Sequence, residues 1–316
     1  MMTHDSSLVS GLRSVALNVP ALALAEDFYT RVWRLNVVAR EANALYLRAT
    51  GADHHVLALH LQPGPAQLRQ VTLRARSLQA LEIVAVTAPA AGGRVVQPAA
   101  PLLTPGGGTG LTIADPDGRL FQLVFGDARH TDGSVHPDAP VRLAHVVLNS
   151  HDVEATRAFM ESVLDFSLAD RTRIMAFMRC NSDHHSIALG DTDNDALNHI
   201  AFLVADVDSV MRGGGRMKDA GYGTEWGPGR HGPGNNVFNY FIGPFDVVIE
   251  YTAEVEQVDD SYVAGQPSDW TWAPGRVDQW GISQPPSARL KEAQRAVCFA
   301  PAGLKAASNT IEDKAA

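Results

Sequence analysis

The chain has 316 residues, of which 45% are hydrophobic, and this length can bury two cores of ordinary size. Its formal net charge of -9 argues against nucleic acids and anionic membrane surfaces as partners, because a negative field repels both, and it favours a small-molecule substrate. The chain has only Cys180 and Cys298, no basic and apolar leader at its start, and no apolar run of about 18 residues. We therefore expect a cytoplasmic protein without a membrane span.

The sequence contains the same pattern of elements twice. Residues 12–18 read LRSVALN and residues 143–149 read LAHVVLN, so each copy opens with a short strand, at 12–17 and 143–148. In the second copy the periodicity predicts a helix from residue 153, with Asp152 as its N-cap. Further elements of this copy are a helix over about 206–220 and strands near 166–171, 174–180, 185–189, 198–204, 237–242 and 246–251.

This order of elements predicts an α+β fold with two domains, each made of paired βαβββ modules whose mixed sheet curls around a cavity. We place the N-terminal domain at residues 1–128 and the C-terminal domain at 141–255. Residues 129–140, rich in Asp, Pro and His, are the predicted linker.

Residues 256–316 form a predicted tail with Trp270, Trp272 and Trp280 and a helical stretch near 286–300. Exposed tryptophans are unfavourable in water. We therefore expect the tail to fold back over a domain or to pack on a neighbouring subunit.

Only the second copy carries a set of candidate metal ligands. In nearly constant register, His145, His199 and Glu250 stand where the first copy has Ser14, Gln70 and Gln122. Two imidazoles and one carboxylate can hold one face of a divalent ion and leave about three positions for substrate and a second reactant. A single histidine in an apolar strand is more often a core residue than a ligand. Three such positions, all replaced in the sister copy, favour one open metal site in the C-terminal domain.

With these ligands in place, residues 10–281 resemble the vicinal oxygen chelate superfamily and, within it, the two-domain type I extradiol catechol dioxygenases. The run RCNSDHHSIAL at 179–189 matches the family segment that holds the acid/base histidine. The resemblance makes His185 the expected catalytic histidine and His184 its neighbour. It also makes Phe177 an aromatic wall of the substrate pocket, which His184 is expected to line as well.

Two further expected catalytic residues follow from the same resemblance. The run GPGRHG at 227–232 matches a family loop and supplies His231, whereas Arg230 is expected to form a salt bridge. The family's active-site tyrosine falls on Tyr240, between that loop and Glu250. Taken alone, His231 and Tyr240 could equally be an ordinary loop histidine and an ordinary strand tyrosine.

The first copy also contains a histidine pair. Residues 53–59 read DHHVLAL and residues 183–189 read DHHSIAL. No ligand set surrounds His54 and His55, so we expect both of them to be structural.

The resemblance implies extradiol (meta) cleavage of a small aromatic diol by O2, with Fe2+ as cofactor and Mn2+ as the alternative, because identical ligands do not distinguish the two metals. A homo-oligomer is also expected. Other activities of the superfamily stay open: hydroquinone-type ring cleavage, a glyoxalase-like reaction without O2, and ligand sequestration. Sequestering members typically lose the metal ligands, which this chain retains.

Two positions bear on the substrate. Arylacetate-cleaving relatives carry arginines where this chain has Trp226 and Val277, with Arg276 adjacent to the second position. Both are expected to line the pocket, so a neutral or aryl substituent on the ring fits better than an acetate. Pro233 stands where biphenyl-diol-cleaving relatives have asparagine, so the chain matches neither branch fully.

Overall fold

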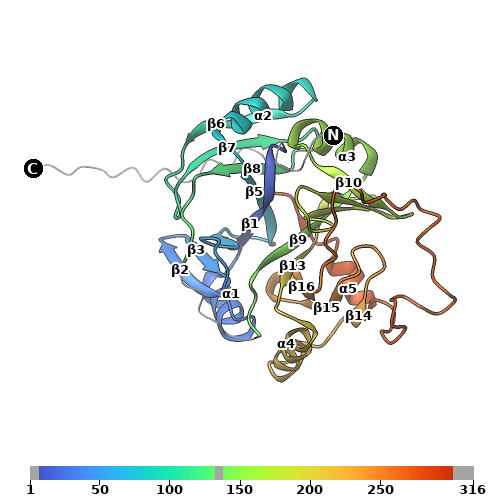
Figure 1. Ribbon diagram of the computed structural model, residues 1–316. Helices are drawn as coiled ribbons and strands as arrows, with labels where there is room; N and C mark the ends of the chain where they lie inside the picture. The colour runs from blue at the N-terminus through green and yellow to red at the C-terminus, as the bar shows by residue number, and fades with distance from the viewer. Residues whose placement is uncertain (1–6, 132–137, 302–316) are drawn as a thin grey trace, which may run out of the picture.

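The computed structural model describes residues 7–131 and 138–301, and two mixed β-sheets form most of it (Figure 1). Each sheet runs from one edge strand to another and does not close into a barrel. This is the α+β architecture predicted from the sequence. No helix within residues 7–131 and 138–301 is both long and apolar enough to cross a bilayer.

The first sheet has eight strands in the order β2-β3-β4-β1-β5-β8-β7-β6, so each half of it comes from one βαβββ module. The first module comprises β1 (Val9–Val19), α1 (Leu22–Asp27), the π-helical turn η2 (Phe28–Val32), β2 (Asn36–Glu41), β3 (Ala44–Arg48) and β4 (Leu57–Leu61). The second comprises β5 (Gln67–Ala75), α2 (Leu78–Ala90), β6 (Arg94–Pro101), β7 (Thr109–Ala114) and β8 (Leu120–Phe125).

The second sheet repeats this plan in the order β10-β11-β12-β9-β13-β16-β15-β14. Its first module comprises β9 (Arg142–Ser150), α3 (Val153–Leu164), β10 (Ser167–Arg171), β11 (Met175–Arg179) and β12 (Ile187–Asp191). Its second comprises β13 (Ala196–Leu203), α4 (Val207–Asp219), β14 (Trp226–Arg230), β15 (Val237–Ile242), the 3-10 turn η3 (Pro244–Asp246) and β16 (Val248–Ala253). The boundaries predicted for the two domains stay a prediction, and residues 132–137 of the predicted linker lie outside the described residues.

Local sequence signals explain most of these elements. Asp152 caps α3 by accepting a hydrogen bond from the backbone N–H of Ala155 at 2.9 Å, as predicted, and Asp206 caps α4 in the same way. The predicted strands of the second copy agree with the observed ones to within about two residues, a normal uncertainty for element ends. The strand β14 was not predicted, because its sequence WGPGR has a low strand propensity and it forms only through pairing with β15.

The tail folds back over the second sheet, which confirms the first of the two alternatives for it. Trp270 and Trp272 lie against Gly232, and the guanidinium of Arg230 lies 5.1 Å from the ring centre of Trp280. The prediction of a helix over 286–300 is wrong in its extent. Only α5 (Ala288–Ala293) is α-helical in this stretch. The strand β17 (Val297–Cys298) pairs with β13, so its backbone groups form hydrogen bonds with that strand and not within a longer helix.

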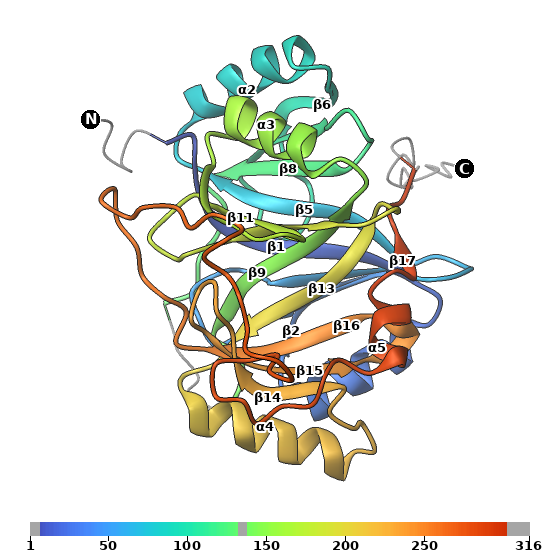
Figure 2. The same ribbon diagram turned by 90° about the vertical axis from the view of Figure 1, so that its right-hand side faces the viewer.

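The two copies pack together through helices at both ends of the molecule. The helices α2 and α3 lie side by side at one end of the molecule, and α4 lies at the opposite end (Figure 1, Figure 2). There, Arg216 of α4 donates a hydrogen bond to the carbonyl of Val32 at 2.8 Å. The ring of Trp33 stacks on Tyr251 at 3.7 Å, and one continuous apolar core runs through both sheets. The two copies therefore share buried surface and support each other.

A buried arginine joins the copies at the turn between β7 and β8. Arg119 is 2% exposed, and its guanidinium binds Asp115 at 2.8 Å and Asp117 at 2.6 Å on its own turn. It also binds Asp195 of the second copy at 2.5 Å and contacts Thr156 at 3.2 Å. One guanidinium thus contacts three carboxylates, one of them in the second copy.

Replacement of this cation should destabilise the whole protein. We expect Arg119→Ala to lower the free energy of unfolding by about 3–5 kcal/mol, because it leaves the buried carboxylate of Asp115 without its cationic partner. The matched control is Arg212→Ala, which removes an exposed ion pair with Asp208 and should leave stability nearly unchanged. Urea denaturation at constant m-value measures both, and equal effects of the two variants would contradict this account of the interface.

Candidate metal centre

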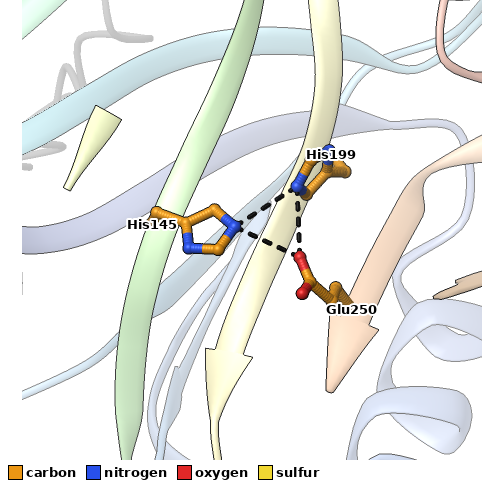
Figure 3. Close-up of side chains that lie close together, drawn as sticks. All are labelled: His145, His199 and Glu250. Carbon is orange, nitrogen blue, oxygen red and sulfur yellow. Dashed lines mark hydrogen bonds and ion pairs between the residues drawn. The ribbon is translucent and has the colours of Figure 1, made fainter. Parts of the chain in front are cut away.

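The three predicted ligands lie on adjacent strands in the middle of the second sheet. His145 on β9 pairs with Ala201, Val147 pairs with His199 on β13, and Ala201 pairs with Glu250 on β16. The side chains point to one place between the strands (Figure 3). In the first sheet, Ser14, Gln70 and Gln122 hold the corresponding pairing positions on β1, β5 and β8. The register deduced from the repeat is therefore confirmed.

The geometry of the three side chains suits a divalent cation. The Nε2 atoms of His145 and His199 lie 3.1 and 3.2 Å from Oε2 of Glu250, and 3.4 Å from each other. Metal–ligand bonds of about 2.0–2.1 Å at right angles place neighbouring donor atoms about 3.0 Å apart. All three residues are at most 5% exposed. The donors are thus arranged as one face of a coordination octahedron.

The electrostatics favour the protonation states that metal binding requires. Burial by itself would raise the pKa of Glu250, but the imidazoles of His145 and His199 outweigh it and hold that pKa well below its usual range. Burial also lowers the pKa of His199. An ionised carboxylate and a neutral imidazole are the forms that bind metals.

Three asparagines that sequence analysis missed surround these ligands. Oδ1 of Asn198 lies 2.8 Å from Nδ1 of His199, which directs the proton to Nδ1 and leaves Nε2 free. Asn149 holds Asn198 through a 2.9 Å hydrogen bond. Asn236 is fully buried, donates to Thr252 at 2.8 Å and approaches Oε1 of Glu250 at 3.5 Å. The role of Asn198 could have been predicted from its position next to His199 in the sequence, whereas no sequence pattern indicates the role of Asn236.

His185, predicted to be catalytic, lies next to the ligand cluster. Its ring centre is 4.3 Å from that of His145, and Phe177 packs edge-on against it at 5.1 Å. The residue is 3% exposed, and burial lowers its pKa well below the usual value. His184 is fully buried, and both of its ring nitrogens contact protein atoms. The role of His184 as a substrate-pocket residue stays a prediction.

His231 and Tyr240 form a second polar group, which lies next to His199. Nε2 of His231 lies 3.0 Å from the hydroxyl of Tyr240, which lies 3.5 Å from Nε2 of His199. Burial lowers the pKa of His231 to about 4 and raises the pKa of Tyr240 well above its usual value. At neutral pH the site thus offers a neutral imidazole and a protonated phenol.

The predicted pocket residues differ in how closely they approach this group. Trp226 stacks on Tyr240 with ring centres 5.0 Å apart and lies 5.1 Å from the ring of His231. Val277 is half-buried in the tail beside the buried Asp278, and its pocket role stays a prediction. Arg230 forms an ion pair with Glu254, as expected from the sequence.

The corresponding place in the first copy is filled differently. There the Arg13 guanidinium lies 2.9 Å from the hydroxyl of Ser14 and 2.5 Å from Nε2 of His55, and it is paired with buried Asp127 at 3.1 Å. Besides the ligand cluster of the second sheet, the described residues contain one other group with metal-binding side chains. This is the half-exposed Asp117, His151 and Asp195, which Arg119 already neutralises in part.

Comparison with known proteins identifies the family. A family model described as the glyoxalase/bleomycin resistance protein/dioxygenase superfamily matches residues 142–251. The crystal structure of a Mn(II)-bound glyoxalase from Novosphingobium aromaticivorans is 36% identical, with a TM-score of 0.83 over 90% of this chain and 94% of that chain. The chain belongs to the glyoxalase/bleomycin resistance protein/dioxygenase superfamily.

Other members of the superfamily show the same similarity more distantly. Metapyrocatechase 2 of Cupriavidus necator is 32% identical over 202 residues, a match that spans 56% of this chain and 62% of that protein. A variant of homoprotocatechuate 2,3-dioxygenase from B. fuscum shares the fold, with 23% identity and a TM-score of 0.78 over 87% of this chain and 79% of that chain.

Proposed function

We propose that this superfamily member is an extradiol dioxygenase that cleaves the ring of a catechol with O2, with Fe(II) held by His145, His199 and Glu250. One observation carries the proposal: a buried set of two imidazoles and one carboxylate has His185 beside His145 and the Tyr240 hydroxyl near His199. The similarity to metapyrocatechase 2 supports it.

The residues around the ligands can perform the proton transfers that this reaction needs. Bound Fe(II) would lower the pKa of the diol and bring it together with O2. His185, neutral and buried, can take a proton from the substrate and return it during ring cleavage. Tyr240 can donate its one hydroxyl proton to a substrate oxygen while it accepts a hydrogen bond from Nε2–H of His231, which orients that hydroxyl. Phe177 and Trp226 provide apolar walls.

A second candidate function follows from the Mn(II)-bound glyoxalase, whose identity and coverage are high. It is a Mn(II)-dependent, glyoxalase-like reaction that does not consume O2. The two candidates make opposite predictions for protein that is reconstituted with either metal under anaerobic conditions and then assayed in the presence of O2. Ring cleavage requires O2 uptake and forms a yellow product from a catechol or a hydroquinone. The glyoxalase-like reaction converts a thiohaemiacetal of methylglyoxal and leaves O2 untouched.

We expect one Fe(II) or Mn(II) per chain. His199→Ala should remove a donor and lower metal affinity by at least about 100-fold, because two remaining ligands hold a divalent ion weakly. The matched control is Gln70→Ala, which alters the corresponding residue of the first sheet and should leave the metal content unchanged. Metal analysis after dialysis tests both, and two ions per chain or full occupancy in His199→Ala would refute the assignment.

A second variant separates binding from chemistry. His185→Asn should keep the metal and still bind a catechol, yet lose on the order of 10²–10⁴ in kcat, the usual contribution of an acid–base group. Its control, His55→Asn, changes the equivalent histidine of the first copy and should keep its turnover. Loss of metal from His185→Asn would make His185 a ligand or a structural residue, and an unchanged kcat would remove it from the reaction.

The charge of the substrate gives another test. A buried carboxylate needs a cationic or multiply hydrogen-bonded partner. On β14 and in the adjoining tail, however, Arg230 is paired with Glu254, Arg276 donates to the carbonyl of Gln279, and Asp278 adds a negative charge.

We therefore expect kcat/KM to favour catechols with alkyl, halo or aryl groups over 3,4-dihydroxyphenylacetate by at least about tenfold, or ~1.4 kcal/mol. Trp226→Arg should narrow this difference. The argument is wrong if the carboxylated catechol proves to be the best substrate in a steady-state panel.

A further inference from the structure

A buried chain of hydrogen bonds leads from His185 away from the ligand cluster. Nδ1 of His185 lies 3.1 Å from Nδ1 of His184, and Nε2 of His184 lies 2.7 Å from Oδ2 of Asp170 on β10. These three residues are 3%, 0% and 0% exposed. The C-terminal tail supplies the last members of this hydrogen-bond chain. The backbone N–H of Gly265 donates to Asp170 at 2.7 Å, and the hydroxyl of Tyr262 donates to the same carboxylate at 3.2 Å.

With Asp170 ionised and His184 neutral, the two contacts determine the order of donors and acceptors along this chain. An ionised carboxylate only accepts hydrogen bonds, so the proton between His184 and Asp170 belongs to Nε2 of His184. A neutral His184 then has no proton on Nδ1, which must accept from Nδ1–H of His185. The remaining nitrogen of His185, Nε2, is left as a bare lone pair. Without the carboxylate, nothing would favour this tautomer over the opposite one.

Comparison of the two copies shows which part of this hydrogen-bond chain belongs to the shared fold. In the first copy, Nδ1 of His54 lies 3.1 Å from Nδ1 of His55, the same contact as in the second copy. Its third member is missing, because Ala39 pairs with Tyr46 where Asp170 pairs with Phe177. A histidine pair thus belongs to the shared scaffold, whereas the carboxylate occurs only beside the candidate metal centre.

We propose that Asp170 and His184 are positioning residues that fix His185 as the Nδ1–H tautomer, so that its Nε2 acts as the base toward substrate. Tyr262 and Gly265 of the tail hold the carboxylate in place. The consequence for turnover rests on the proposed function. The tautomer itself is a property of the metal-free chain and can be measured there.

The direct test is ¹⁵N NMR of histidine-labelled, metal-free protein, which distinguishes protonated from bare ring nitrogens. We expect His184 to carry its proton on Nε2 and His185 on Nδ1, with the signals assigned by their loss in His184→Gln and His185→Asn. Asp170→Asn should shift His185 toward the Nε2–H form, because an amide can also donate to His184. In the Fe(II)-loaded enzyme it should lower kcat on the order of 10²-fold, while catechol affinity and metal content stay nearly unchanged.

His54→Gln is the matched control, since it breaks the equivalent pair of the first copy and should leave both the His185 tautomer and kcat unaltered. Tyr262→Phe removes only one donor to Asp170 and should give a smaller change in the same direction. It serves as the test if Asp170→Asn does not fold. An Nε2–H tautomer of His185 in the wild-type protein overturns the inference, as does an unchanged tautomer and kcat in Asp170→Asn. A wild-type protein that shows the expected tautomers but consumes no O2 with any catechol would instead refute the proposed function.

Discussion

The buried carboxylate of Glu250 is the constraint on which the second half of the molecule depends. It has no exposed surface, and its nearest polar neighbours are the imidazoles of His145 and His199. An isolated buried charge would be strongly destabilising, so a cation must compensate it, whether a proton on a histidine or a bound metal. Its strand β16 lies between β13 and β15 and cannot move without breaking two ladders of hydrogen bonds. The three donor atoms are therefore preorganised by the sheet.

The first copy contributes to this rigidity although it carries no comparable ligand set among its described residues. Tyr251, the neighbour of Glu250, is stacked on Trp33 of the first copy and donates a hydrogen bond to the carbonyl of Trp33 at 3.3 Å. Arg216 also contacts the Tyr251 hydroxyl at 3.0 Å. Successive residues of a strand face opposite sides of the sheet. Glu250 thus faces the ligands while Tyr251 is fixed from the other side by the sister copy.

Sequence reasoning reached the fold and the ligand register because both depend on local periodicity and on the internal repeat. Asp170 was missed, since it meets His184 through packing of β10 beside the loop before β12, and no spacing in the sequence predicts that contact. The contribution of Tyr262 comes from the path of the tail, which depends on tertiary packing alone. Such contacts require coordinates because long-range packing, unlike a period of two or of 3.6 residues, leaves no local pattern.

The duplication shows how one scaffold supports two buried polar sites of different character. In the first copy, Arg13 and Asp127 stand where the second copy has Ala144 and Val255, so a fixed guanidinium lies beside the histidine pair. In that copy the buried charges compensate each other, because the cation, Arg13, is a side chain of the protein itself. In the second copy these two positions are apolar, and the compensating charge must come from outside or from a proton. The difference between a structural core and a candidate metal centre thus lies in which partner supplies the cation.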